Sequence, residues 1–390
     1  MKKVITGDHA VAIGAKLSRA EVVPAYPITP QTLIIEHIAD FVNDGEMDAK
    51  FLTMESEHSV MSAAAAASAA GARVFTATSS QGLALMHEML YATAPLRLPV
   101  VMVNANRTLG GPPGIWCEHN DSMGARDSGW LQVYVEDNQE ALDMVIQSYR
   151  IAEDKRVLLP VMPCLDGFVL THTVEPVEVP DQKDVDSFLP PYNPDITLDP
   201  AMPAMIGTFM PAEYIMEMRR QTAGAFESAK KVILEINDEF AKDFGRNYGG
   251  LVDTYMIEDA NAILITMGTV TSTTREIVDE LRKEGEKVGL VKLRFFRPFP
   301  SEELRKVLAN ADAVGVVDRS ISYHGGGPAY NEICSSLYGL TIPVINHLAG
   351  IGGRDVTKEQ IIKMFEITIK AANGEKVKEI YWHNTRGETV

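Results

Sequence analysis

The chain has 390 residues, of which 46% are hydrophobic and 23% charged, and its formal net charge is −17 at pH 7. This length predicts two or three domains of a globular protein. The negative charge argues against a nucleic-acid-binding protein, because phosphate contacts need clustered Lys and Arg. It suits an enzyme or an acidic docking surface. No apolar run approaches the ~20 residues of a membrane span, and we expect a cytoplasmic protein without a membrane anchor.

Residues 1–173 alternate helix-like and strand-like segments, which predicts an α/β domain with a doubly wound parallel sheet. The strand-like segments are continuous apolar runs, as expected where helices cover both faces of a sheet. We expect strands at 21–25, 51–54, 73–78, 99–104 and 157–162, and helices at 10–17, 58–70, 82–92 and 138–152.

Residues 174–258 differ in composition. Prolines are frequent up to Pro211 and hydrophobic periodicity is lost, which predicts a linking or wrapping arm. A helix at 212–244, ended by Gly245, leads to a second, smaller α/β domain at 259–390. We expect the strands of this domain at 262–267, 288–293, 313–317 and 343–346.

The three cysteines, Cys117, Cys164 and Cys334, are widely spaced. The sequence has no CxxC motif, and we find no cluster of cysteine and histidine. This argues against an iron–sulfur cluster or a zinc site held by this chain alone, so we expect no metal site here. It also fits a reducing compartment.

The segment from Tyr26 to Pro30 is a stiff loop after an expected strand. Pro27 and Pro30 fix their own φ angles and bias the preceding residues away from the helical region. The hydroxyl of Thr29 is therefore presented with little freedom, which suits the binding of a small anionic group. The alternative is a rigid turn in which Thr29 only satisfies a backbone group.

Glu57 lies where an expected strand gives way to an alanine-rich helix. It is a candidate for acid–base chemistry. A carboxylate in the first turn of a helix is also favoured by the helix dipole, and this is its commoner use. The alanines that follow indicate close packing of the helix, as at an interface or against a flat cofactor.

Arg107 follows another expected strand, and ligands usually bind at the ends of parallel strands. A guanidinium there suits a carboxylate by bidentate pairing, although a salt bridge at the rim is equally plausible. The glycine-rich segment from Gly110 to Ser122 is a candidate substrate-covering loop.

The polar turn from Thr78 to Gly82 precedes a helix and is a candidate for receiving part of a cofactor at its backbone N–H groups. No GxGxxG or P-loop motif is present. The segment from Gly350 to Asp355 is interpreted as a structural turn.

Several motifs together resemble the α subunit of 2-oxoacid:ferredoxin oxidoreductases, above all that of the pyruvate enzymes. The resemblance covers nearly the whole chain and keeps the order of the motifs. They are YPITP from Tyr26, MESEHS from Met54, FTATSSQGL from Phe75, Asn106-Arg107, RDSGW from Arg126 and GIGGRDVT from Gly350.

The resemblance implies a thiamine-diphosphate enzyme whose α chain supplies the pyrimidine-binding domain and a transketolase C-terminal-like domain. Glu57 would hydrogen-bond the aminopyrimidine ring and favour the imino tautomer that removes the proton from the thiazolium carbon. Thr29 and Arg107 would hold the substrate carboxylate. The resemblance further implies cofactor contacts at Pro27, Ile28, Ser80, Gln81 and Gly82, and substrate contacts at Gly110 and Gly111.

Parts of such an enzyme are missing from this chain. It has no GDG motif for diphosphate and Mg²⁺, and it has no cluster cysteines. The resemblance therefore implies a hetero-oligomer. A β subunit would bind diphosphate and Mg²⁺, and γ- and δ-type subunits would carry the coenzyme A-binding domain and [4Fe–4S] clusters. Ferredoxin would accept the electrons and coenzyme A the acyl group.

Pyruvate is the expected substrate from its frequency in the family. Gly110 and Gly111 remove side-chain volume, so an aryl 2-oxoacid such as phenylglyoxylate is an alternative. Oxalate ranks lower, because Thr29 offers no extra positive charge. Two further alternatives are a non-catalytic scaffold subunit and a thiamine enzyme of another reaction type, such as a transketolase.

Overall fold

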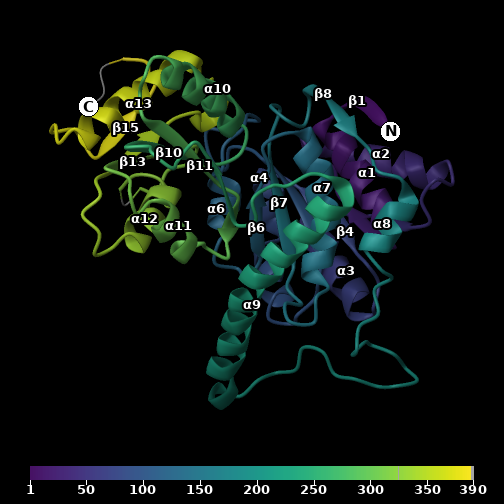
Figure 1. Ribbon diagram of the computed structural model, residues 1–390. Coiled ribbons are helices and arrows are strands. Elements are labelled where there is room, and N and C mark those ends of the chain that lie inside the picture. Colours follow the sequence, from purple (N-terminus) through teal and green to yellow (C-terminus); the bar gives the residue numbers. More distant parts are fainter. Residues whose placement is uncertain (324, 388–390) are drawn as a thin grey trace.

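The computed structural model describes residues 1–323 and 325–387. They form two α/β units, with a long helix that lies along the first unit and projects beyond it (Figure 1). Within the described ranges no helix is long and apolar enough to cross a membrane.

The first unit is built on a sheet with the strand order β12-β6-β7-β5-β4. Four of these strands are parallel, and β12 pairs antiparallel with β6. The parallel pair β2-β3 adjoins the β4 edge through a bridge between Val22 and Val74. The strands are β2 Val22–Ala25, β3 Lys50–Thr53, β4 Phe75–Thr78, β5 Val101–Asn106, β6 Leu131–Tyr134, β7 Val161–Asp166 and β12 Phe295–Arg297.

Helices cover both faces of this sheet, as a doubly wound fold requires. Along β5, Val101 and Val103 face the helices α1, α2 and α7, whereas Met102 faces α3, α4 and α5. The helices are α1 Gly7–Leu17, α2 Thr32–Asn43, α3 Glu57–Ala69, α4 Ser80–Leu85, α5 His87–Thr93, α6 Asn120–Gly124 and α7 Asn138–Ala152.

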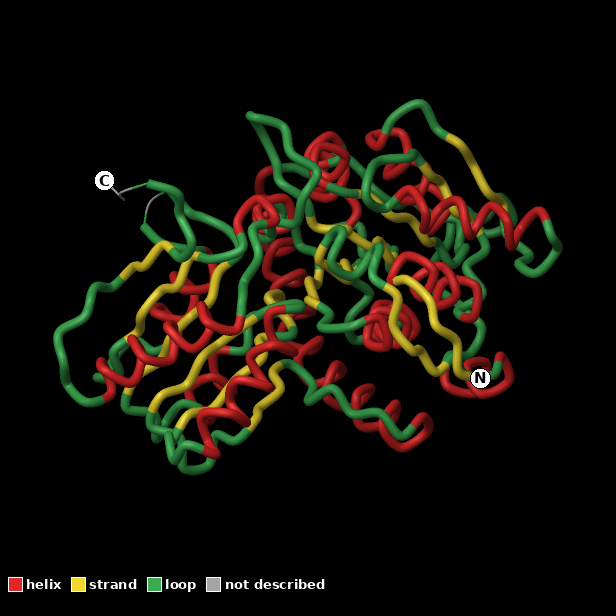
Figure 2. The backbone as a smooth tube through the Cα atoms, turned by 90° about the horizontal axis from the view of Figure 1, so that it is seen from above, coloured by secondary structure: helices red, strands yellow, loops and turns green. Residues whose placement is uncertain are grey.

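The second unit has a sheet with the strand order β15-β14-β13-β10-β11-β9, all parallel except β9. Figure 2 shows its strands between two layers of helices. The strands are β9 Val252–Tyr255, β10 Ala262–Thr266, β11 Val288–Leu293, β13 Ala313–Asp318, β14 Val344–Leu348 and β15 Ile380–Trp382. The helices are α10 Val270–Lys283, α11 Ser301–Val307, α12 Pro328–Ser336 and α13 Lys358–Ala372, with a short 3₁₀ helix, η1, at Ile351–Gly353.

Between the units, α9 (Ala212–Phe244) runs for 33 residues and ends at Gly245 in the left-handed region, at φ 72°, as the sequence predicts. Its C-terminal half packs on α7 through buried residues that include Val232, Ile236 and Phe240. Its N-terminal half stands off the body (Figure 1). Large apolar side chains are exposed there and on the preceding loop: Met202, Met205, Phe209, Tyr214, Ile215 and Met216.

Several elements differ from the sequence-based expectations. The segment expected to be an irregular arm contains β8 (Val174–Glu178), which pairs with β1 (Lys2–Thr6), and α8 (Gln182–Phe188). The helix expected at 82–92 is divided at Met86 into α4 and α5. The strand expected at 157–162 is wrong at its first four residues, because β7 begins only at Val161.

Candidate active site

The carboxylate of Glu57 lies against the start of α4. Glu57 is the first residue of α3, whose N-cap is Ser56, and its side chain is 6% exposed. A Cβ atom on Gly82 would stand 2.6 Å from Glu57 Oε1 and 2.6 Å from Thr78 Oγ1. Only glycine allows this approach. The Thr78 hydroxyl is buried and has no hydrogen-bond partner among the described residues, so this corner can receive a polar ligand group.

The turn between β4 and α4 is held by the rest of the chain. Ser80 has φ 46°, and its N–H donates to Asp121 Oδ2 at 3.1 Å. The Gly82 N–H donates to the carbonyl of Ser79 at 2.8 Å. These two amides are therefore not free donors for a cofactor, contrary to the predicted use of this turn. Gln81 is exposed, and its Oε1 accepts the Ser80 hydroxyl at 2.6 Å.

The loop that follows β2 brings Thr29 to Arg107. Thr29 and Pro27 are exposed and Ile28 is half-buried, while buried Gln31 closes the loop by donating to the carbonyl of Tyr26 at 2.8 Å. Arg107 Nη1 donates to the backbone carbonyl of Thr29 at 2.8 Å. The two residues predicted to bind a carboxylate are thus adjacent, although the guanidinium meets the Thr29 backbone rather than its hydroxyl.

Arg107 begins the segment we call the β5–α6 loop, residues 107–119. Its Nε donates to the carbonyl of Gly114 at 2.8 Å, and burial lowers the pKa of its guanidinium somewhat below the usual value. Gly110 and Gly111 lie at the exposed tip of the loop, where an added Cβ would meet no described atom within 4 Å. The described residues therefore build no pocket wall at the two glycines.

Asp121 joins the two halves of the site and was missed in the sequence. Its buried carboxylate accepts the N–H groups of Ser80 and Arg107, each at 3.1 Å, and the side-chain amides of Asn104 and Asn106. Burial nonetheless raises the pKa of Asp121 above its ordinary value. The chain around Asp121 gives no local signal, because these partners come from two other segments, the turn at Ser80 and the end of β5.

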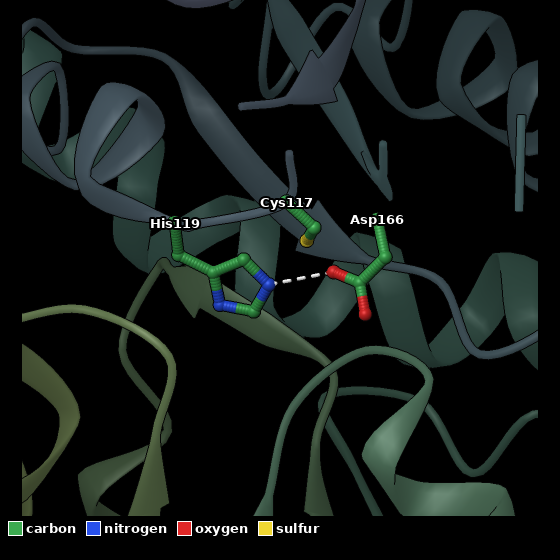
Figure 3. Close-up of side chains that lie close together, drawn as sticks. All are labelled: Cys117, His119 and Asp166. Atoms are coloured by element: carbon green, nitrogen blue, oxygen red, sulfur yellow. Dashed lines mark hydrogen bonds and ion pairs between the residues drawn. The ribbon is translucent and has the colours of Figure 1, made fainter. Parts of the chain in front are cut away.

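A second buried cluster lies where the two units meet. Figure 3 shows Cys117, His119 and Asp166 together, with His119 Nε2 2.7 Å from Asp166 Oδ1. Cys117 and His119 are only two residues apart, so the expectation that the chain has no cluster of cysteine and histidine was wrong.

The geometry of this cluster argues against a cation. Arg319 Nη1 already lies 2.6 Å from Asp166 Oδ2. Burial raises the pKa of Asp166, but the neighbouring Arg319 and His119 outweigh it and hold that pKa well below the usual range. Burial raises the pKa of the Cys117 thiol, which keeps it protonated and a poor ligand. We assign the cluster to the contact between the units.

The segment from Gly350 to Asp355 also contacts the β5–α6 loop. Gly352 N donates to Glu118 Oε2 at 3.1 Å, and a Cβ on Gly353 would collide with the Cβ of Trp116. This segment, which was expected to be a structural turn, carries the short 3₁₀ helix η1. It thus contacts the loop that begins at Arg107.

Comparison with protein-family models gives two matches. The model described as "Pyruvate flavodoxin/ferredoxin oxidoreductase, thiamine diP-bdg" matches residues 13–238. The model described as "Pyruvate:ferredoxin oxidoreductase core domain II" matches residues 260–361.

Individual proteins agree with these matches. Pyruvate synthase subunit PorA of Methanothermobacter thermautotrophicus is 53% identical over 367 residues, which cover 93% of this chain and 95% of the relative. Ketoisovalerate oxidoreductase subunit VorA of Pyrococcus horikoshii is 45% identical over 391 residues, which cover 99% of this chain and 98% of the relative.

Among solved structures, a 2-oxoglutarate:ferredoxin oxidoreductase from Magnetococcus marinus matches with a TM-score of 0.73 and 22% identity. The match covers 94% of this chain and 65% of that chain. At this identity the likeness concerns the fold alone.

The two-unit α/β architecture, with polar side chains gathered at the strand ends, is therefore that of a thiamine-diphosphate-binding fold. The chain belongs to the family of 2-oxoacid:ferredoxin oxidoreductase α subunits. The resemblance noted in the sequence and the predicted fold class are both confirmed.

Proposed function

We propose that this chain is the subunit in which Glu57 orients thiamine diphosphate while Arg107 and Thr29 bind the carboxylate of a 2-oxoacid, in its oxidative decarboxylation to an acyl-CoA. The observation that carries the proposal is the meeting of Arg107 with Thr29, linked through Asp121 to the turn beside Glu57. These groups come from four separate segments of the first unit and gather at the strand ends.

The corner around Glu57 fits the aminopyrimidine end of the cofactor. Its carboxylate can accept an N–H from the ring, and the unpartnered Thr78 hydroxyl offers a second polar contact beside it. Gly82 keeps the space above the carboxylate free of side-chain atoms. When bound, thiamine diphosphate supplies the nucleophilic carbon and the electron sink that decarboxylation requires. Pro27 and Ile28, on the loop after β2, are proposed as further contacts.

The carboxylate of the substrate would be held by the remaining donors of Arg107 and by the Thr29 hydroxyl. The Nε of Arg107 donates to Gly114 and its Nη1 to Thr29, so the N–H groups of Nη2 are the donors proposed for the substrate carboxylate. A guanidinium fixed at two of its nitrogens loses little conformational entropy on binding an anion. Arg107 therefore serves as a preorganised carboxylate-binding group.

Pyruvate is the proposed substrate, because the relative with the higher identity of the two reported above, at 53%, is a pyruvate synthase subunit. A branched 2-oxoacid is the second candidate, supported by the VorA relative at 45% identity. An aryl 2-oxoacid such as phenylglyoxylate is the third candidate substrate, because the space at Gly110 and Gly111 is open. Family membership favours a catalytic subunit over a scaffold.

The chain is proposed to work with partner subunits. It lacks the GDG motif, so we assign diphosphate and Mg²⁺ to a β subunit, and [4Fe–4S] clusters and the coenzyme A-binding domain to γ- and δ-type subunits that pass electrons to ferredoxin. The exposed apolar side chains on α9 and the preceding loop support burial in an assembly. Residues 1–173, 174–258 and 259–390 are proposed as pyrimidine-binding domain, connecting segment and transketolase C-terminal-like domain.

The test is purification of the native complex, mass spectrometry of the co-purifying chains, and a panel of 2-oxoacids. We expect β, γ and δ chains, CoA-dependent reduction of a viologen dye, and release of labelled CO₂ from 1-labelled pyruvate. If kcat/KM is highest with 2-ketoisovalerate or phenylglyoxylate, that acid replaces pyruvate as the assigned substrate. Absence of CO₂ release from every 2-oxoacid would overturn the reaction type.

A further inference from the structure

The half of the β5–α6 loop that returns to the sheet is held by the second unit. Three of its last residues, and the first residue of α6, lie against two loops of that unit, one after β13 and one after β14. The contacts pair Trp116 with Gly353, Glu118 with Gly352, His119 with Arg319, and Asn120 with Ile321.

The contact with the loop after β14 depends on backbone that only glycine adopts easily. Gly352 and Gly353 have φ angles of 67° and 76°. Gly352 N donates to Glu118 Oε2 at 3.1 Å, and a Cβ on Gly353 would collide with Trp116. Glu118 is 7% exposed, so this interaction is shielded from water.

The contact with the loop after β13 fixes the second unit against the first. Arg319 is buried, lies 2.6 Å from Asp166 at the end of β7, and accepts the N–H of His119 at its carbonyl at 3.0 Å. A buried pair with this geometry is costly to separate, because either charge alone would be left without its partner. The second unit therefore presents its two loops to the β5–α6 loop from a fixed position.

The returning half of the loop in turn holds Arg107. The carbonyl of Gly114 accepts Arg107 Nε at 2.8 Å, and the carbonyl of Trp116 accepts the N–H of Thr108 at 2.9 Å. A displacement of residues 114–116 would therefore rotate the guanidinium away from Thr29.

We propose that Glu118 is a positioning residue for substrate binding: through its contact with Gly352 the second unit sets the orientation of Arg107. This inference rests on the proposed function, in which Arg107 binds the substrate carboxylate. Glu118 itself contacts neither substrate nor cofactor in this account. A substitution of Glu118 should therefore change KM for the substrate rather than kcat.

The test uses the complete complex and steady-state kinetics with pyruvate. Glu118→Ala removes the acceptor, Glu118→Gln keeps an oxygen for Gly352 N, and Gly353→Ala pushes on Trp116. We expect Glu118→Ala and Gly353→Ala to raise KM about tenfold, as for the loss of one buried hydrogen bond, with kcat within about twofold. Glu118→Gln should restore KM to within about twofold of wild type. Lys358→Ala, which removes an exposed ion pair of the second unit with Glu276, is the control.

Arg107→Ala separates the two claims. If it raises KM and Glu118→Ala raises KM no further in that background, the positioning role stands. If Arg107→Ala raises KM while Glu118→Ala and Gly353→Ala leave it unchanged, or if the effects simply multiply, the positioning role is overturned and the proposed function remains. If Arg107→Ala leaves KM unchanged, both fall. Gly353→Ala provides the answer if the Glu118 variant does not assemble.

Discussion

The guanidinium of Arg107 donates to the backbone carbonyl of Thr29 across 2.8 Å, although 78 residues separate them in the chain. This contact joins the end of β5 to the proline-rich loop after β2. Asp121 Oδ2 accepts both the backbone N–H of Arg107 and that of Ser80. The substrate side and the cofactor side of the proposed site are therefore parts of one hydrogen-bonded network.

The role of Arg107 predicts a large and selective effect on substrate binding. Arg107→Lys keeps the charge but cannot reproduce donation to Thr29, Gly114 and a carboxylate at once. We expect KM for pyruvate to rise about 10- to 100-fold, the value of one or two charge-assisted hydrogen bonds. Steady-state viologen reduction by the complex measures this. Arg156→Lys, at an exposed ion pair with Asp154 and Glu235, should leave KM unchanged and is the matched control.

The contact between Gly82 and Glu57 predicts that one methyl group impairs the site. Gly82→Ala would place a Cβ 2.6 Å from Glu57 Oε1 and should lower kcat/KM at least tenfold by displacing the carboxylate. Gly224→Ala is the matched control, because this glycine of α9 has open space around it. That variant should keep full activity and stabilise the helix by about 0.5–1 kcal/mol. Equal activity of the two variants would contradict the close approach.

A buried ion cluster near the junction of the units predicts a stability effect. Burial raises the pKa of Glu140, but Lys292 and Arg294 outweigh it and hold that pKa at about 2. Arg294 Nε lies 2.8 Å from Glu140 Oε1. Glu140→Gln removes the carboxylate that Arg294 and Lys292 share, although Lys292 keeps its pair with Glu136 at 3.2 Å. The variant should destabilise the first unit by about 3–5 kcal/mol.

Thermal or urea unfolding of the complex measures the effect of Glu140→Gln. The stabilisation by Glu140 is fully present above the ordinary glutamate pKa and is lost as pH falls towards 2. Glu227→Gln, at an exposed pair with Lys230, should change stability by less than about 0.5 kcal/mol. If Glu140→Gln lowers stability no more than Glu227→Gln does, the buried ion cluster does not stabilise the first unit.

Two histidines of the second unit predict a pH dependence. His347 Nδ1 and His383 Nε2 are 3.0 Å apart, and burial lowers the pKa of both, that of His383 to about 4. An unfolded histidine has a pKa of about 6.5, so below that pH the unfolded chain binds more protons and stability falls. The contribution of the two neutral histidines to stability is therefore fully present above pH ~6.5 and is lost as pH falls towards 4.

Hydrogen exchange of the β14 and β15 amides in the complex measures this loss. His383 alone should make their protection weaker by about 2 kcal/mol at pH 5 than at pH 7, after correction for intrinsic rates. His383→Gln should reduce the difference. Protection that is equal at the two pH values in the wild-type complex would contradict the buried neutral histidines.

Much of the fold was predictable because its signals are local. The apolar run of β5 and the left-handed glycine at the end of α9 each identify an element from adjacent residues. The shifted start of β7 was not predictable. Val157 and Leu158 belong to the same apolar run, but their carbonyls accept hydrogen bonds from Arg97, a distant residue that keeps them out of the sheet.

The candidate site shows the same limit. Thr29 and Arg107 could be identified as candidates because each follows an expected strand, but no local pattern indicates that the guanidinium meets a backbone carbonyl. Asp121 and Glu118 escaped notice because their partners lie up to 234 residues away. Tertiary contacts of this kind have no local pattern.

The central proposal is that the carboxylate of Glu57 binds the aminopyrimidine ring of thiamine diphosphate. The most direct measurement is pyruvate-dependent viologen reduction by the assembled complex carrying Glu57→Gln, with Glu88→Gln on an exposed position of α5 as control. We predict a loss of at least about 10³-fold in kcat for Glu57→Gln, as for removal of a positioned acid–base group, and full activity for the control. Wild-type activity of the Glu57→Gln complex would contradict the account.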